Sequence, residues 1–269
     1  MPIGWVRQQE VAGGSIRAGF TDRSGGVSVG NYAGLNLGHH VGDERSAVEE
    51  NRKALAEEIG VRPVYMDQVH SATLRSALPY IADKSFAAPT TDGLIVDLAQ
   101  AGAPSRAAAC VMVADCIPVL IVSAERPAAA AVHAGRRGLL SGIVPAAVER
   151  VGGLVDVYAG PCICGSCYEV SAQMAEESAS VLAPTAAVSR WGTPALDLRA
   201  GLRAQLSDLH NVRSVHIDER CTMEDSALYS YRRATRSVAG GPEKPATGRF
   251  AGVIVVEKEE QSDTPASPR

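Results

Sequence analysis

The chain has no surplus of basic residues and no long hydrophobic run, and each absence excludes a class of function. Lys and Arg total 26 against 30 Asp and Glu in 269 residues, which gives a formal net charge of −4. Proteins that bind nucleic acid through its phosphates usually carry a positive surplus, so we expect no nucleic-acid partner. No segment approaches the roughly 20 consecutive apolar residues of a membrane helix, so we expect no membrane association.

Cysteine is also scarce, with six residues in the whole chain. Six are too few for a disulfide scaffold in a chain this long, which can bury a core without such cross-links. The first residues, MPIGWVRQQEVAGG, do not resemble an export signal, because no charged start precedes an apolar run. We therefore expect a cytoplasmic protein with reduced cysteines, which are candidate metal ligands or nucleophiles.

Helix and strand patterns alternate along the sequence, which predicts a single compact α/β (α+β mixed) domain with a mixed sheet flanked by helices. The domain is expected over residues 1–258, with a disordered tail over residues 259–269. Low order is also expected over residues 238–248, which are rich in Gly and Pro. The expected strands are 107–113, 119–123, 128–132, 154–158, 212–217 and 250–256, and the expected helices are 44–59, 139–151, 170–182 and 199–209.

The helix over residues 44–59 has signals at both ends. Asp43 is a suitable N-cap, Val48, Leu55 and Ile59 fall on one face, and Gly60 can end the helix. This pattern predicts an amphipathic helix that packs on the sheet.

Three apolar segments end in side chains that can bind a metal: His70, Cys116 and His133. Strand ends present side chains to a pocket, and two imidazoles with one thiolate suit Zn²⁺. Three protein ligands leave a fourth position open, as in catalytic zinc sites. The spacing itself is no local metal signature, and buried histidines with a small core cysteine would explain the same residues.

A set of ordered motifs resembles the laccase-domain family, the YfiH-type polyphenol oxidases, from about Ser15 to Val256. The motifs are Asn36-Leu37-Gly38-His39-His40-Val41-Gly42-Asp43, Asn51-Arg52, Gln68-Val69-His70, Ala114-Asp115-Cys116-Ile117-Pro118-Val119, Val132-His133-Ala134-Gly135-Arg136-Arg137-Gly138, Gly160-Pro161-Cys162-Ile163-Cys164, Tyr168-Glu169-Val170, Asp197-Leu198-Arg199, Cys221-Thr222 and Tyr229-Ser230-Tyr231-Arg232-Arg233.

The resemblance implies a metal site formed by His70, Cys116 and His133. It implies phosphorolysis of adenosine, inosine and methylthioadenosine, together with deamination of adenosine. The small-molecule partners would then be a purine nucleoside and phosphate. Cys116 and Asp115 are the candidate catalytic residues, with Asp115 chosen for its place within a motif.

Two residues depart from the family pattern. Ser71 follows Gln-Val-His where the family usually has Gly, and this change is tolerable if the backbone there is not left-handed. Arg136 stands where the family usually has Trp, so a cation replaces an aromatic side chain near the metal ligands.

Two arginine-containing segments are candidate anion sites. After His133, small residues and a helix start place Arg137 where phosphate could bind, although solvated arginines on a tight turn are the alternative. Arg232 belongs to a second cluster of hydroxyl and cationic groups, which could equally be an exposed basic turn. Asn36, in the first motif, is a further candidate for substrate binding.

Cys162, Cys164 and Cys167 form a C-x-C-x-x-C run. We interpret Cys162 and Cys164 as loop packing near the pocket, with redox chemistry as the alternative. A zinc ribbon would need a second cysteine pair, and the sequence has none. The H-x-E signature of zinc deaminases is absent as well. Of His39 and His40, one could line the pocket, or both could be exposed.

Three functions compete at this point. The first is a zinc-dependent purine nucleoside enzyme. The second is a copper-dependent phenol oxidase with a mononuclear copper site, because the 6 His of the chain are too few for a multicopper cluster. The third is an editing role linked to cell wall or division, with which the family has also been connected.

Overall fold

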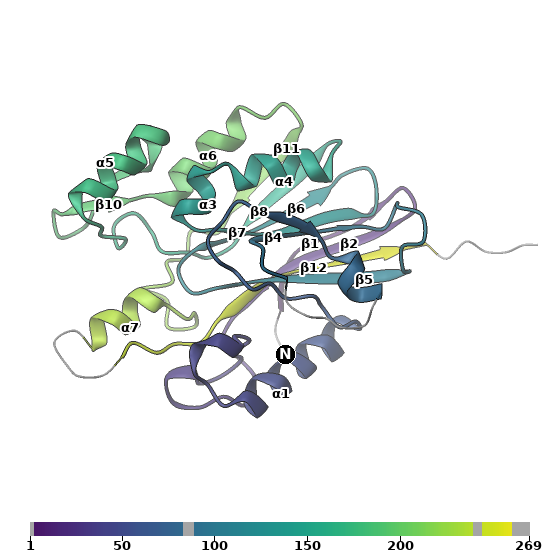
Figure 1. Ribbon diagram of the computed structural model, residues 1–269, viewed down its shortest axis with the longest axis horizontal. Helices are drawn as coiled ribbons and strands as arrows, with labels where there is room; N and C mark the ends of the chain where they lie inside the picture. Colours follow the sequence, from purple (N-terminus) through teal and green to yellow (C-terminus); the bar gives the residue numbers. More distant parts are fainter. Residues whose placement is uncertain (1–2, 83–88, 239–243, 260–269) are drawn as a thin grey trace, which may run out of the picture.

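The computed structural model of the protein describes residues 3–82, 89–238 and 244–259. It contains two larger β-sheets stacked on each other, with helices on both outer faces (Figure 1). The expected class, a mixed α/β fold with a mixed sheet flanked by helices, is confirmed.

The first sheet has four antiparallel strands in the order β1-β2-β12-β5. These strands are β1 (Ile3–Val11), β2 (Gly14–Thr21), β12 (Phe250–Lys258) and β5 (Arg106–Val113). The last described strand of the chain thus lies between the second and the fifth, which brings the first and the last described strands into one sheet.

The second sheet has six strands in the order β11-β8-β6-β7-β4-β3. Its two outer pairs are parallel and its inner pairs antiparallel, so the sheet is mixed. Its strands are β3 (Leu74–Ser76), β4 (Gly93–Asp97), β6 (Ile117–Ser123), β7 (Ala128–Ala134), β8 (Val155–Ala159) and β11 (Val212–Ile217). A separate hairpin-like pair joins β9 (Ala186–Val188) to β10 (Pro194–Leu196).

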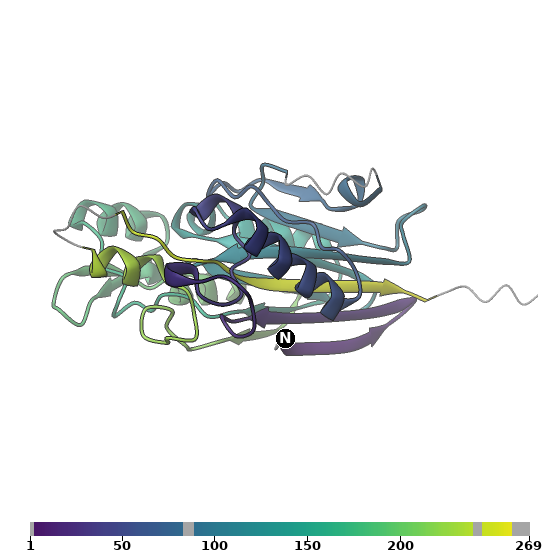
Figure 2. The same ribbon diagram turned by 90° about the horizontal axis from the view of Figure 1, so that it is seen from below.

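Apolar side chains fill three layers. One core lies between the two sheets, a second lies between the six-stranded sheet and α3 (Arg136–Leu140), α4 (Ile143–Val151) and α6 (Leu198–Ser207), and a third lies under α1 (Arg45–Ile59). Figure 1 shows α1 on the opposite side of the sheets from α3, α4 and α6, and Figure 2 shows α1 running across the four-stranded sheet.

Strand β5 illustrates why its sequence is apolar throughout. Ala107, Ala109 and Val111 face the core between the sheets, whereas Cys110 and Met112 face the layer under α1. A strand buried on both faces needs no polar alternation, which explains the continuous apolar run.

Three further helices complete the described elements. They are α2 (Leu78–Ala82), α5 (Ala172–Val181) and α7 (Tyr231–Ser237), together with 3-10 turns at Gly30–Tyr32, His39–Val41 and Ala183–Thr185. No helix in the described ranges is both long and apolar enough to span a membrane.

Most predicted elements are present, with two corrections. The N-cap position of α1 is Glu44 rather than Asp43, and the Glu44 side chain makes no capping hydrogen bond. The Asp43 carboxylate instead accepts hydrogen bonds from the side chains of Ser28 and Asn36. The helix expected over residues 139–151 is two helices, since Gly142 at φ 75° interrupts it. Gly60 does end α1 in a left-handed conformation, as predicted.

Two segments of expected low order are only partly covered. Residues 239–243 and 260–269 lie outside the described residues. The predicted tail, residues 259–269, and the predicted domain limit at residue 258 therefore stay predictions.

Candidate metal centre and active site

A cavity of about 530 Å³ opens where β5, the turn into β6 and the end of β7 meet. Its wall combines aromatic and apolar side chains with imidazoles, a thiol and two guanidinium groups. It is lined by His40, Gln68, His70, Met112, Val113, Ala114, Asp115, Cys116, His133, Ile163, Tyr168, Leu198, Tyr231, Arg232 and Arg249.

The three predicted metal ligands come together in this cavity. We call His70, Cys116 and His133 the His–Cys site. One potential ligand atom from each lies within 4.8 Å of the other two, and Cys116 Sγ is 3.8 Å from His70 Nε2. The site combines a loop residue before β3, a turn residue before β6 and a residue of β7. His70 and His133 are 63 positions apart in the sequence, and the order of the strands in the sheet brings them together.

Backbone strain is concentrated at this site. Among the described residues, the non-glycine residues with positive φ are His70 at 61° and Asp115 at 106°. Such conformations cost about 1–3 kcal/mol each and persist where the surroundings enforce them. His70 is itself a predicted ligand and Asp115 directly precedes Cys116, so the fold places these side chains at a cost in backbone energy.

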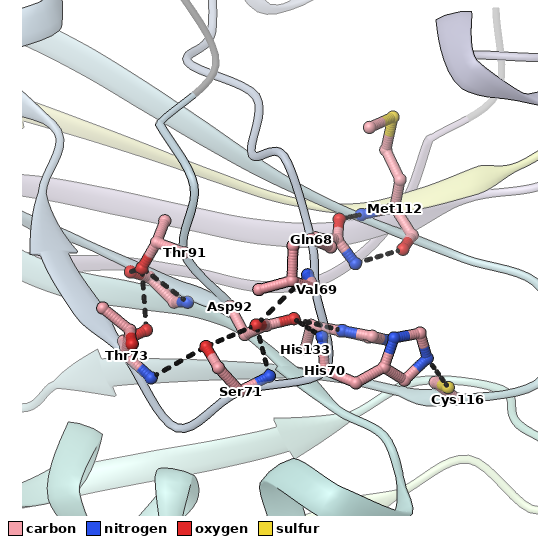
Figure 3. A network of polar contacts seen from close by, with 11 residues as sticks. Gln68, Val69, His70, Ser71, Thr73, Thr91, Asp92, Met112, Cys116 and His133 are labelled. Carbon is pink, nitrogen blue, oxygen red and sulfur yellow. Dashed lines mark hydrogen bonds and ion pairs between the residues drawn. The ribbon is translucent and has the colours of Figure 1, made fainter.

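Asp92, which sequence reasoning missed, holds the His–Cys site together (Figure 3). This fully buried carboxylate accepts hydrogen bonds from the backbone amides of Val69, His70 and Ser71, and from the Ser71 hydroxyl. Its Oδ1 also lies 2.8 Å from His133 Nδ1. A carboxylate on Nδ1 leaves Nε2 of His133 for a metal, which is the usual support of a ligating histidine.

The charges of the His–Cys site are coupled. Burial by itself would raise the pKa of Cys116, but the neighbouring His133 and His70 lower it to about 6. Burial would lower the pKa of His133, whereas Cys116 and Asp92 raise it to about 9. The surroundings thus favour a thiolate, the form of cysteine that binds metals.

Gly135 is required by close packing around the ligands. A Cβ atom there would lie 2.9 Å from Cys116 Sγ and 3.0 Å from His70 Cδ2. Ser71 is not left-handed, which is the condition under which the sequence tolerates Ser at this position. Its amide and hydroxyl instead strengthen the hydrogen-bond network of Asp92.

Two arginines line the cavity, Arg232 and Arg249. Arg232 lies in the first turn of α7, and its backbone amide donates to Asp115 Oδ2 at 2.6 Å, while the Thr222 hydroxyl donates to Asp115 Oδ1. Asp115 therefore orients Arg232, in addition to lining the cavity itself. Arg249 was not a candidate from the sequence, because it stands alone between a Gly-rich segment and β12.

The other two predicted binding residues lie elsewhere. Arg137 is exposed on α3 and is not part of the cavity lining. Asn36 is fully buried, and its Oδ1 accepts the backbone amides of Gly38 and Arg249. The structure thus gives Asn36 a role in positioning Arg249, and binding by Asn36 or Arg137 stays a prediction.

Two further lining residues have clear local roles. The Gln68 side chain pairs with the backbone of Met112 at 2.8 and 2.9 Å, which ties the His70 loop to β5. His40 lines the cavity, and burial together with Arg249 lowers its pKa.

The chain is similar in sequence to a known protein family. A family model described as "Multi-copper polyphenol oxidoreductase laccase" matches residues 17–257. The chain therefore belongs to this laccase-domain family of enzymes, as the motifs indicate.

Relatives within the family carry a different name. A protein of Streptomyces coelicolor named purine nucleoside phosphorylase is 39% identical over 258 residues, covering 93% of this chain and 98% of the relative. A Mycobacterium tuberculosis protein with the same name is 40% identical over 253 residues, covering 90% and 92%.

Solved structures show the same fold. A Neisseria meningitidis protein of family DUF152 has a TM-score of 0.75 at 31% identity, covering 90% of this chain and 94% of that one. YlmD of Geobacillus stearothermophilus has a TM-score of 0.72 at 30% identity, covering 96% and 100%. None of these similarities identifies the metal.

Proposed function

We propose that this protein is a zinc-dependent purine nucleoside phosphorylase that also deaminates adenosine. The observation that carries the proposal is the convergence of the His–Cys site with Arg232 and Arg249 in one cavity. The names of the relatives support phosphorolysis of purine nucleosides. A volume of about 530 Å³ is in the range of small-molecule sites.

The donor set fits zinc. Two imidazoles and one thiolate are borderline ligands that Zn²⁺ accepts, and three protein ligands leave one position for a reactant. When bound there, zinc supplies Lewis acidity and lowers the pKa of a bound water toward neutrality. Asp92 orients the His133 ring for metal binding, because its carboxylate is hydrogen-bonded to Nδ1 and leaves Nε2 for the ion.

In phosphorolysis, phosphate replaces the purine at the anomeric carbon of ribose. The bond from that carbon to the base nitrogen breaks, a bond to a phosphate oxygen forms, and the leaving base takes a proton. Arg232 and Arg249 bind the phosphate by charge-assisted hydrogen bonds. Tyr168 offers a ring against the purine, and Arg232 already lies 5.3 Å from the centroid of that ring.

Deamination is a different substitution, at C6 of the adenine base: a bond to a water oxygen forms there, the exocyclic amino group leaves as ammonia, and the glycosidic bond stays intact, which gives inosine. The catalytic candidates are Cys116, as a metal ligand, and Asp115, through its position beside Arg232. The substrates adenosine, inosine and methylthioadenosine follow from the family resemblance.

The proposal is tested by incubating the purified protein with adenosine, with and without phosphate, and analysing the products. Adenine and ribose 1-phosphate formed only with phosphate indicate phosphorolysis, and inosine indicates deamination. No product from any purine nucleoside would contradict the proposal and favour the editing role.

Copper-dependent oxidation of phenols is the second candidate, because the family model carries an oxidoreductase name. A thiolate with two imidazoles also suits copper. Phenol oxidation that depends on copper, with no nucleoside turnover in the zinc-loaded protein, would favour it.

A further inference from the structure

We propose that Cys164, Cys167, Cys221 and Glu224 form a second metal site, which takes Zn²⁺ and stabilises one wall of the cavity. We call these four residues the cysteine cluster. Their potential ligand atoms, three sulfurs and a carboxylate oxygen, all lie within 4.8 Å of one another. The proposal does not depend on the proposed function.

The distances suit a tetrahedral zinc site. With Zn–S bonds of about 2.3 Å, two sulfurs of a tetrahedron lie about 3.8 Å apart. The cluster is therefore within about 1 Å of the required spacing before any ion binds. Three thiolates and one carboxylate complete four-coordination, which is typical of a closed structural site.

Two turns build the cluster. The amides of Cys167 and Tyr168 both donate to the Cys164 carbonyl at 3.0 Å, which brings Cys164 and Cys167 onto one side of a turn. The amide of Glu224 donates to the Cys221 carbonyl at 3.0 Å, which brings Cys221 and Glu224 together on the second turn.

The two turns are joined directly. The backbones of Cys162 and Cys221 pair in an isolated parallel β-bridge, in which the Thr222 amide donates to the Cys162 carbonyl at 3.1 Å. The Cys164 amide also donates to Cys221 Sγ at 3.4 Å. An amide that donates to sulfur favours the thiolate, which is the form that binds zinc.

Charge around the cluster supports a bound cation with several anionic ligands. Three thiolates and one carboxylate carry four negative charges, of which Zn²⁺ neutralises two. Arg190 offsets part of the remainder, because its Nη2 lies 3.1 Å from Cys167 Sγ and pairs with Glu224. Cys164 is half-buried and lines a second cavity of about 390 Å³, which gives an ion a path from solvent.

An ion at the cluster would hold residues of the main cavity in place. Cys167 directly precedes Tyr168, and the Cys167 carbonyl accepts a hydrogen bond from Arg232. Cys221 directly precedes Thr222, whose hydroxyl donates to Asp115 at 2.6 Å. The cluster thus links both turns to the residues that orient Arg232.

Metal analysis of the purified, reduced protein tests the proposal. We expect about two zinc ions per chain in the wild type, and one in Cys164→Ser, Cys167→Ser and Cys221→Ser. The matched control is Cys110→Ser, a buried cysteine of β5 outside both sites, which should keep two. Wild-type zinc content in all three cluster variants would overturn the proposal.

The same measurement separates the two sites. Cys116→Ala should remove one zinc ion, and Cys116→Ala combined with Cys167→Ser should remove both. If a single ion is present and only Cys116→Ala removes it, the cysteine cluster is not a metal site, while the proposed function is untouched. If only Cys167→Ser removes it, the His–Cys site fails as a zinc site and the cluster stands.

A titration of the metal-free wild type with Co²⁺ tests the proposal even if the cysteine variants do not fold. Thiolate-to-cobalt charge-transfer absorption grows with the number of thiolates, so three thiolates should give a much stronger band than Cys116 alone. Glu224→Gln should keep this band, since it removes no thiolate, and should weaken zinc affinity about tenfold or more. A disulfide within the cluster, seen as a two-mass-unit loss without the cobalt band, would overturn the proposal in favour of a redox pair.

Discussion

The His–Cys site and the cysteine cluster are built by different parts of the fold. In the His–Cys site, the three side chains come from a loop, a turn and a strand end, and they line a cavity of about 530 Å³. The backbone has a positive φ at His70, a member of the site, and at Asp115, which precedes Cys116. In the cysteine cluster, the ligands come from two hydrogen-bonded turns, and Glu224 reaches in from the surface.

The charged groups that surround the two sites also differ. Asp92, a buried carboxylate, orients a ligand of the His–Cys site, whereas the cation Arg190 compensates charge at the cysteine cluster. Strain, a supporting carboxylate and an open position are features of a reactive site. A thiol-rich set on two tethered turns is suited to holding structure. The type of side chain and its supporting contacts, more than the proximity of the potential ligand atoms, therefore distinguish the two sites.

The largest expected effect is the loss of catalysis on removing the central thiolate. Cys116→Ala should lower nucleoside turnover at least about 100-fold, since it removes one of the three proposed metal ligands. Product analysis with adenosine and phosphate measures this effect, and Cys110→Ala is the control. Turnover that persists in Cys116→Ala would place the chemistry away from the His–Cys site.

A smaller effect is expected when the ligand support is changed but no ligand is removed. Asp92→Asn should weaken zinc affinity at the His–Cys site by about 10–100-fold, because an amide cannot accept all the bonds that the carboxylate accepts. Zinc affinity is measured by competition with a chelator.

The control for Asp92→Asn is Asp97→Asn at the other end of β4. Asp97 pairs with Arg126 and touches neither site, so its substitution should affect stability but not zinc affinity. Equal affinities in both variants would mean that Asp92 only stabilises the fold.

Anion binding gives a third test, within the cavity. Arg232→Ala should raise the KM for phosphate about tenfold or more, since a charged hydrogen bond contributes about 1.5–3 kcal/mol. Zinc content should not change, because the backbone amide that donates to Asp115 remains. Arg137→Ala should have the smaller effect, because Arg137 is exposed outside the cavity lining. A larger effect at Arg137 would return the anion site to the turn after His133.

The smallest expected effect concerns secondary structure. A chelator should abolish turnover and leave the far-ultraviolet circular dichroism nearly unchanged, since three apolar cores hold the sheets and helices. Stability should fall moderately as ions leave the cysteine cluster, as thermal unfolding will measure. Loss of the dichroism signal would show that a metal is needed for the fold itself.

Elements whose signals are local could be predicted from the sequence. Continuous apolar runs predicted β5, β6 and β7, because a doubly buried strand excludes polar residues. Gly60 predicted the end of α1, because few other residues adopt its left-handed conformation at no cost. The ordered motifs predicted the family and, through it, the candidate residues His70, Cys116 and His133.

Only the tertiary structure decided which residues meet. The role of Asp92 depends on β4 lying beside β7, and that of Arg249 on the last strand entering the sheet next to β5. Likewise Cys221 lies 54 residues after Cys167 and completes the cysteine cluster. The sequence did not indicate this cluster, because it contains no second closely spaced pair of cysteines. The physical reason is that periodicity and turn residues act over a few positions, whereas strand order and the packing of three cores fix contacts between distant segments.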